Sequence, residues 1–162
     1  MAPVPQQIPL ELRVTPLGSN EALRLITALN TELAALYPEP GANHFRLDPD
    51  EVAPGRGIFV IGYVSGEAVA CGAVRKLDAH TAEVKRMYVH PAARGRGYAR
   101  RVLAYLEGAA LRLGVNRLLL ETGVRQLAAI ALYRRCGFID VERYTEYVDS
   151  PLSLCMGKDL AT

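Results

Sequence analysis

The order of apolar and polar positions predicts strands and helices in turn along the first third of the chain. Residues 10–17 alternate as a strand does, and residues 20–36 repeat leucine and isoleucine at helical spacing, with Asn20 as the expected N-cap. Residues 38–57 mix proline, glycine and charge without a steady period. We expect them to form a long loop that holds one helical turn.

A change of period near residue 97 divides the middle of the chain. Before it, residues 58–77 form two apolar runs joined by Ser65-Gly66, which predicts a hairpin, and residues 81–89 add a third, antiparallel strand. After it, apolar side chains recur every three or four residues until Gly114, which predicts a helix that ends at this glycine.

The last third of the chain again predicts strands and a helix. Residues 117–123 predict a strand buried on both faces, and residues 127–136 an amphipathic helix that stops at Gly137. Residues 138–144 and 152–160 predict two final strands. The sequence therefore predicts one α/β (α+β) domain over residues 1–162, with 1–9 as a flexible leader and a mixed central sheet of about six or seven strands flanked by helices.

Composition narrows the class of protein. The 162 residues are 50% hydrophobic and 22% charged, and a net charge of +2 gives no argument for a nucleic-acid or membrane partner. Three cysteines without paired spacing favour reduced thiols over disulfides or a zinc site, and there is no signal-peptide pattern or long apolar window. We expect a cytoplasmic, soluble protein without a metal.

The segment from Tyr88 to Leu103 has the pattern of an anion site. A strand ends near Val89, and two glycines, Gly95 and Gly97, come before a helix whose first backbone N–H groups have no partner in the helix. The positive charge of an arginine at a helix start is unfavourable, because that end of the helix dipole is also positive, unless an anion binds there. The spacing fits neither a P-loop nor a dinucleotide-binding fingerprint.

Two motifs resemble the Gcn5-related N-acetyltransferases (GNAT): "RGRGYA" at residues 94–99, after a strand, and "AAIALYRRCGF" at residues 128–138. The resemblance implies a GNAT-like acyl-CoA N-acyltransferase fold with acetyl-CoA as co-substrate. Gln126 stands where the family often has asparagine. The cofactor-binding residues that the resemblance implies are Met87, Tyr88, Val89, Arg94, Gly95, Arg96, Gly97, Tyr98, Ala99 and Gln126.

The same resemblance implies that Tyr133 protonates the departing thiolate, a task that suits a phenol. Glu83 is the first candidate for the catalytic base, because it lies in a strand that borders the expected cleft. Glu121 and a water molecule stay open as alternatives. His44 and His90 are weaker candidates, since an isolated histidine is usually a polar surface residue.

We therefore expect an acetyl-CoA-dependent N-acetyltransferase that acetylates a primary amine of a small molecule, by direct attack in a ternary complex. The alternatives are a protein or peptide N-acetyltransferase and a non-catalytic CoA-binding sensor. The loop 38–57 is expected to cover the acceptor and select it. Arg86, Tyr63, Tyr144 and Tyr147 are candidates to line the acceptor site, and a homodimer stays open.

Overall fold

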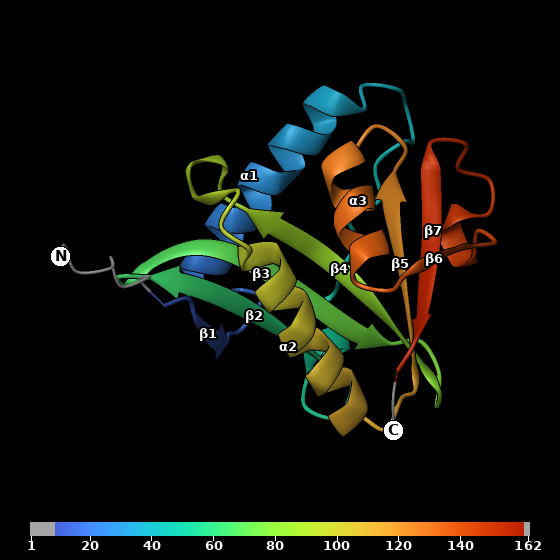
Figure 1. Ribbon diagram of the computed structural model, residues 1–162. Helices are drawn as coiled ribbons and strands as arrows, with labels where there is room; N and C mark the ends of the chain where they lie inside the picture. Colours follow the sequence, from blue (N-terminus) through green and yellow to red (C-terminus); the bar gives the residue numbers. More distant parts are fainter. Residues whose placement is uncertain (1–8, 161–162) are drawn as a thin grey trace, which may run out of the picture.

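A seven-stranded mixed sheet with helices on both faces forms the protein (Figure 1). The structure is a computed structural model that describes residues 9–160. The strands are β1 Glu11–Val14, β2 Gly57–Val64, β3 Glu67–Lys76, β4 Thr81–Val89, β5 Arg117–Gly123, β6 Ile139–Val141 and β7 Ser153–Asp159. The helices are α1 Asn20–Leu36, α2 Tyr98–Arg112 and α3 Leu127–Arg135, with short 3-10 helices η1 Pro49–Val52, η2 Pro91–Ala93 and η3 Thr145–Tyr147. This order of elements and the mixed sheet confirm the predicted fold class.

The sheet runs in the order β1-β2-β3-β4-β5-β7-β6, so the last two strands are exchanged relative to the sequence. Every neighbouring pair is antiparallel except β4 and β5, which are parallel. A parallel pair needs a crossover, which α2 provides between the two strands.

The pairing of β4 with β5 is short and opens a split in the sheet. Hydrogen bonding joins Thr81–Val84 to Arg117–Leu120 only, although both strands continue beyond. Figure 1 shows the two strands diverging toward α1 and α3. Residues 85–89 of β4 therefore have no strand partner on the β5 side within the described chain. Apart from the Val89 carbonyl, which accepts a hydrogen bond from Arg94, their main-chain groups on that side can bind a ligand.

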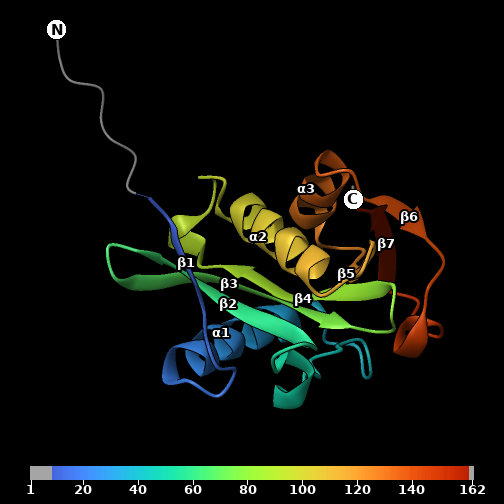
Figure 2. The same ribbon diagram turned by 90° about the horizontal axis from the view of Figure 1, so that it is seen from below.

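The helices divide the core into two layers (Figure 2). α2 buries Val102, Leu103 and Leu106 against one face of the sheet. α1 buries Leu25 and Leu29 against the other face. The sheet is thus covered on both sides where β2, β3 and β4 run together, and the split between β4 and β5 lies at the edge of this covered region.

Several predicted boundaries were wrong in detail. α1 is capped by Ser19 and not by Asn20, since the Ser19 hydroxyl accepts a hydrogen bond from the Ala22 N–H at 3.2 Å. The first strand, expected over residues 10–17, spans only Glu11–Val14, and Val14 is 59% exposed at this edge of the sheet. The strand expected over residues 138–144 is only three residues long, since it pairs with β7 alone. The predicted leader lies outside the described residues except for Pro9.

Candidate active site

The turn before α2 forms a cradle of backbone N–H groups, which we define as residues 95–100. Gly95 and Gly97 have φ of 80° and 79°, a left-handed conformation that glycine adopts without strain. No side chain caps the helix, and its first turn contains no acidic residue. Within the described chain, none of these N–H groups donates a hydrogen bond to a backbone or side-chain acceptor. The cradle is therefore ready to bind an anion.

A cleft of about 750 Å³ extends from the cradle along β4 to α3. Nine of the ten residues expected to bind the cofactor line it: Met87, Tyr88, Val89, Arg94, Gly95, Gly97, Tyr98, Ala99 and Gln126. Arg96 is exposed and does not line the cleft, whereas Arg100, which sequence reasoning missed, does. The opposite wall is apolar and comes from α1, through Leu29, Leu33 and Leu36.

Arg94 joins this cleft to α1. Its Nη2 lies 2.8 Å from the Glu32 carboxylate, and its Nε donates to the carbonyl of Val89 at 2.8 Å. Arg94 and Glu32 both line the cleft, so this ion pair links its β4 side to α1. Nothing in the sequence motif indicates Glu32, because that residue lies on a helix distant in sequence.

Gln126 shapes the turn that leads into α3. Its Oε1 accepts a hydrogen bond from the Gly123 N–H at 2.8 Å. The next residue back, Arg125, donates its backbone N–H to the Tyr37 hydroxyl at 2.9 Å. These two bonds fix the turn against the end of α1, so Gln126 borders the cleft on a rigid segment.

A second, smaller cavity of about 80 Å³ lies in the split between β4 and β5; we call it the inner cavity. Tyr133 borders both this cavity and the larger cleft, from α3. Its side chain is 7% exposed, and burial, followed by the negative charge of Glu121, raises the pKa of its hydroxyl. Tyr133 therefore keeps its proton and can donate it.

Glu121, on β5, also lines the inner cavity. Burial raises the pKa of its carboxyl to about 7, although a hydrogen bond from the Ser153 hydroxyl, at 2.9 Å, opposes this rise. Ser153 in turn lies 2.7 Å from the Ser150 hydroxyl, which lies 2.9 Å from Nε2 of His44. A continuous hydrogen-bonded chain thus joins Glu121 to His44 in the long loop.

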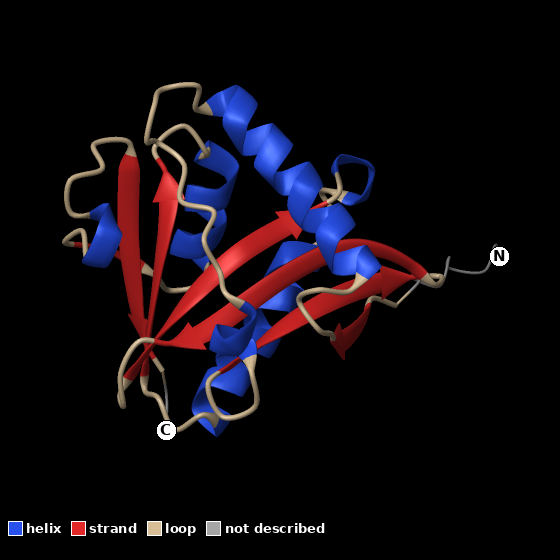
Figure 3. Cartoon of the chain, turned by 180° about the vertical axis from the view of Figure 1, so that it is seen from behind, coloured by secondary structure: helices blue, strands red, loops and turns tan. Residues whose placement is uncertain are grey.

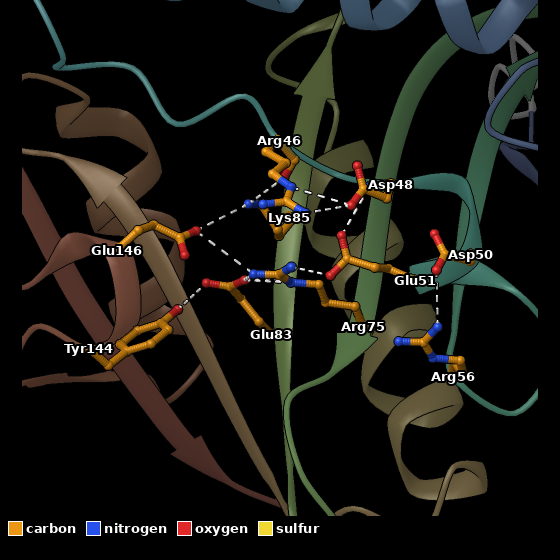
Figure 4. Close-up of polar contacts among 10 residues, drawn as sticks. All are labelled: Arg46, Asp48, Asp50, Glu51, Arg56, Arg75, Glu83, Lys85, Tyr144 and Glu146. Atoms are coloured by element: carbon orange, nitrogen blue, oxygen red, sulfur yellow. Dashed lines mark hydrogen bonds and ion pairs between the residues drawn. The ribbon is translucent and has the colours of Figure 1, made fainter.

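Glu83 has a different environment, although it is fully buried. The Arg75 guanidinium lies 2.8 Å from its carboxylate, and the Tyr144 hydroxyl donates to it at 2.5 Å (Figure 4). Arg75 also pairs with Glu51, in η1. Glu83 is not among the residues that line either cavity, so the structure does not bring it together with Tyr133.

The remaining candidates separate into two groups. The inner cavity is lined by His44, Arg86 and Tyr147. The rings of His44 and Tyr147 pack edge to face, with their centres 5.0 Å apart. Tyr63 and Tyr144 line neither cavity. His90 is exposed and accepts a hydrogen bond from the Ala92 N–H at 3.1 Å at the start of η2.

Within residues 9–160, no three or more histidine, cysteine, aspartate or glutamate side chains are grouped so that they could hold a metal ion. No helix in the same range is long and apolar enough to cross a membrane.

Comparisons with known proteins agree with this geometry. Residues 23–138 match the acetyltransferase (GNAT) family. An "IAA acetyltransferase" of Azospirillum brasilense is 42% identical over 149 residues, 91% of this chain and 95% of that protein. A solved structure from Klebsiella pneumoniae, assigned to the acyl-CoA N-acyltransferases, has a TM-score of 0.80 and 32% identity, over 94% of this chain and 98% of that one. A GNAT family acetyltransferase from Elizabethkingia anophelis with acetyl-CoA bound shares the fold, with a TM-score of 0.68 and 15% identity over 96% and 100% of the two chains.

Proposed function

Since the chain belongs to the GNAT family of acetyltransferases, we propose that it transfers the acetyl group of acetyl-CoA to a primary amine of a small molecule, by direct attack in a ternary complex. One observation carries the proposal: the unbonded N–H groups of the cradle and the hydroxyl-bearing Tyr133 border one continuous cleft. A phosphate-bearing thioester can lie along such a cleft with its reactive end at Tyr133.

The residues of the cleft fit coenzyme A. The cradle N–H groups and the positive end of the α2 dipole suit a diphosphate. The edge of β4 at Met87 to Val89 has no strand partner on the β5 side and offers main-chain groups to an extended amide-containing arm, apart from the Val89 carbonyl that Arg94 holds. The apolar side chains of α1 lie on the opposite wall. Bound acetyl-CoA would supply an acetyl thioester at the inner end of this cleft.

Glu121 and Tyr133 are proposed as the base and the acid. A carboxylate with a pKa of about 7 is well matched to accept a proton from an amine near neutral pH. The Tyr133 hydroxyl holds a proton at the border of the two cavities, where a departing thiolate needs one. Glu83, the first candidate from the sequence, is paired with Arg75 instead, and this favours Glu121 for the role of base.

The chain of hydroxyls behind Glu121 gives its proton a way out. Ser153 and Ser150 connect the carboxylate to His44, which is partly exposed. Burial lowers the pKa of His44, so this imidazole is neutral at physiological pH and can exchange protons with solvent. We infer that Glu121 is returned to its basic form through this chain after each turnover.

A small acceptor is favoured by what covers the inner cavity. Figure 3 shows the segment between α1 and η1 running across the split between the diverging strands. His44, from that segment, lines the inner cavity, and the Lys85 ammonium donates to the carbonyl of Arg46 at 2.7 Å. A cavity of about 80 Å³ that is bordered by such a segment suits a small amine better than a protein chain.

The direct test is release of CoA thiol from acetyl-CoA in the presence of a panel of amines, with IAA assayed separately because the name of one relative contains it. Thiol release that depends on a small amine, with the acetylated amine identified by mass spectrometry, is the expected result. Binding of acetyl-CoA without turnover on any small amine would favour a sensor. Turnover only on peptides would favour a protein acetyltransferase.

A further inference from the structure

Arg86 occupies an unusual backbone position at the split in the sheet. Its φ is 59°, which is uncommon for a residue other than glycine. The register between β3 and β4 shifts here, since Lys85 pairs with Ala73 and Tyr88 with Cys71. This bulge breaks the usual alternation of side chains, so that the neighbouring cations Lys85 and Arg86 both reach the inner cavity.

The guanidinium of Arg86 is buried without an anionic partner. Arg86 as a whole residue is only 7% exposed. One nitrogen, Nη2, donates to the Asn30 side-chain oxygen, and Cζ lies 5.3 Å from the centre of the Phe45 ring. Nε is fully buried and has no hydrogen-bond partner. Within residues 9–160, no carboxylate lies within 4.0 Å of this guanidinium.

Arg75, another arginine with little exposure, has the counter-ions that Arg86 does not have. Arg75 is nearly as buried, but it lies between the carboxylates of Glu83 and Glu51. A buried charge without a counter-ion is strongly unfavourable, as is a buried N–H without an acceptor. An anion that approached from the inner cavity would therefore stabilise the Arg86 guanidinium.

The opposite side of the inner cavity supplies the other half of a recognition site. Glu121 lines the cavity from β5, while Arg86 and Lys85 line it from β4. The Lys85 ammonium is already bonded to the Arg46 carbonyl and lies 3.9 Å from Glu146, so Arg86 is the cation with free donors. A ligand with a negative group and an amine would match the cations of β4 and the carboxylate of β5.

On this basis, and resting on the acetyltransferase function proposed above, we propose that the acceptor is a small amine that also carries a carboxylate, and that Arg86 binds this carboxylate while the amine faces Glu121. A carboxylate is favoured over a phosphate or phosphonate because of its charge. It carries a single negative charge, which matches the single cation with free donors, Arg86, whereas a phosphate group carries up to two near neutral pH. The second charge would have no free cation and would lie in the same cavity as the Glu121 carboxylate.

The test compares acceptors that differ only in the negative group. Each α-amino acid in the panel is paired with its amide, which keeps the amine and the side chain, and with its aminophosphonate. Wild-type protein is expected to acetylate the amino acids with a kcat/KM about 10²-fold above that of the amides. Equal rates on acids and amides, or a preference for the phosphonates, would overturn the proposal.

Arg86→Met removes the charge and keeps the length of the side chain. It should lower kcat/KM for the amino acids about 10²-fold and change that for the amides less than about threefold. Arg24→Met, an exposed arginine of α1 that lines neither cavity, is the matched control and should leave both unchanged. Equal losses on acids and amides in Arg86→Met would also overturn the proposal.

Binding separates this proposal from the proposed function. Calorimetry with propionate and with propionamide should detect binding of propionate to wild-type protein and none to Arg86→Met, whether or not any amine is acetylated. If no amine is acetylated but propionate binds through Arg86, the acetyltransferase function fails and the anion site stands. If amines are acetylated but propionate does not bind, the anion site fails alone.

Discussion

The guanidinium of Arg75 lies directly across the β3–β4 pair from Glu83, with Nη2 2.8 Å from Oε1. The two side chains are 12% and 1% exposed, and Arg75 also forms an ion pair with Glu51 of η1. Glu83 thus has a structural counter-ion, and Glu121, on the other side of the split, is left as the carboxylate that lines the inner cavity.

This relationship predicts a large loss of stability when Arg75 is replaced. Arg75→Met leaves Glu83 buried without its counter-ion and should lower the free energy of unfolding by about 3–5 kcal/mol in denaturant titrations. Arg56→Met is the control, because the Arg56–Asp50 pair is exposed on both sides and such a pair contributes under about 1 kcal/mol. Similar small effects from both substitutions would contradict a structural role for the buried pair.

The cradle predicts that Gly97→Asp weakens CoA binding strongly. The aspartate would place a carboxylate among N–H groups proposed to bind a diphosphate, and calorimetry with CoA should show the loss. Gly66→Asp is a matched control, because Gly66 has a similar φ of 81°, also in open space, but lies in the β2–β3 turn. A folded Gly97→Asp protein with the affinity of the control would show that the cradle does not bind CoA.

Tyr133→Phe tests the proposed acid. The ring, with its edge-to-face contact to Phe138, is retained, and only the hydroxyl is lost. Single-turnover acetyl transfer should fall by about 10²-fold, with melting temperature and CoA affinity little changed. The control is Tyr105→Phe on α2, which lines neither cavity. Wild-type single-turnover rates in Tyr133→Phe would assign this tyrosine to the core.

Ser153→Ala tests the hydrogen bond that Glu121 accepts. This bond stabilises the charged carboxylate and so lowers its pKa. Without it, the pKa of Glu121 should rise, and the pH below which activity falls should move upward. Ser150→Ala keeps the Ser153 hydroxyl and should cause a smaller shift. A pH profile that does not move, or that moves downward, would mean that Ser153 does not act on the base.

Much of the fold could be predicted because local signals agreed with it. The hairpin at Ser65-Gly66, the helix start at Gly97 and the helix end at Gly114 are all confirmed. Each of the three glycines adopts a positive φ. The exchange of β6 and β7 in the sheet could not be predicted, because no local pattern indicates which strand pairs with β5.

The choice between Glu83 and Glu121 shows the same limit within the site. Both lie in strands next to the split, and a sequence pattern does not state which partner faces each carboxylate. One signal was present: counting outward from the turn between β3 and β4 places Arg75 opposite Glu83. The bulge at Arg86 had no such signal, since a positive φ in a strand depends on the packing around it.

The assignment of Glu121 as the base for acetyl transfer can be tested through the pH dependence of kcat/KM. Wild type and Glu121→Gln are compared with the acceptor that the amine panel identifies. Because Glu121 must lose its proton to act as a base, kcat/KM of wild type divided by kcat/KM of Glu121→Gln should rise tenfold per pH unit up to about pH 7 and then level off. Ionisation of the acceptor amine affects both proteins alike and cancels in this ratio.

Above pH 7, Glu121→Gln should be about 10²-fold slower than wild type. Glu83→Gln, assayed at a temperature at which it stays folded, should keep the wild-type pH profile. A Glu121→Gln protein with the rate and pH profile of wild type, together with a Glu83→Gln protein that loses both, would exclude Glu121 as the base and return this role to Glu83.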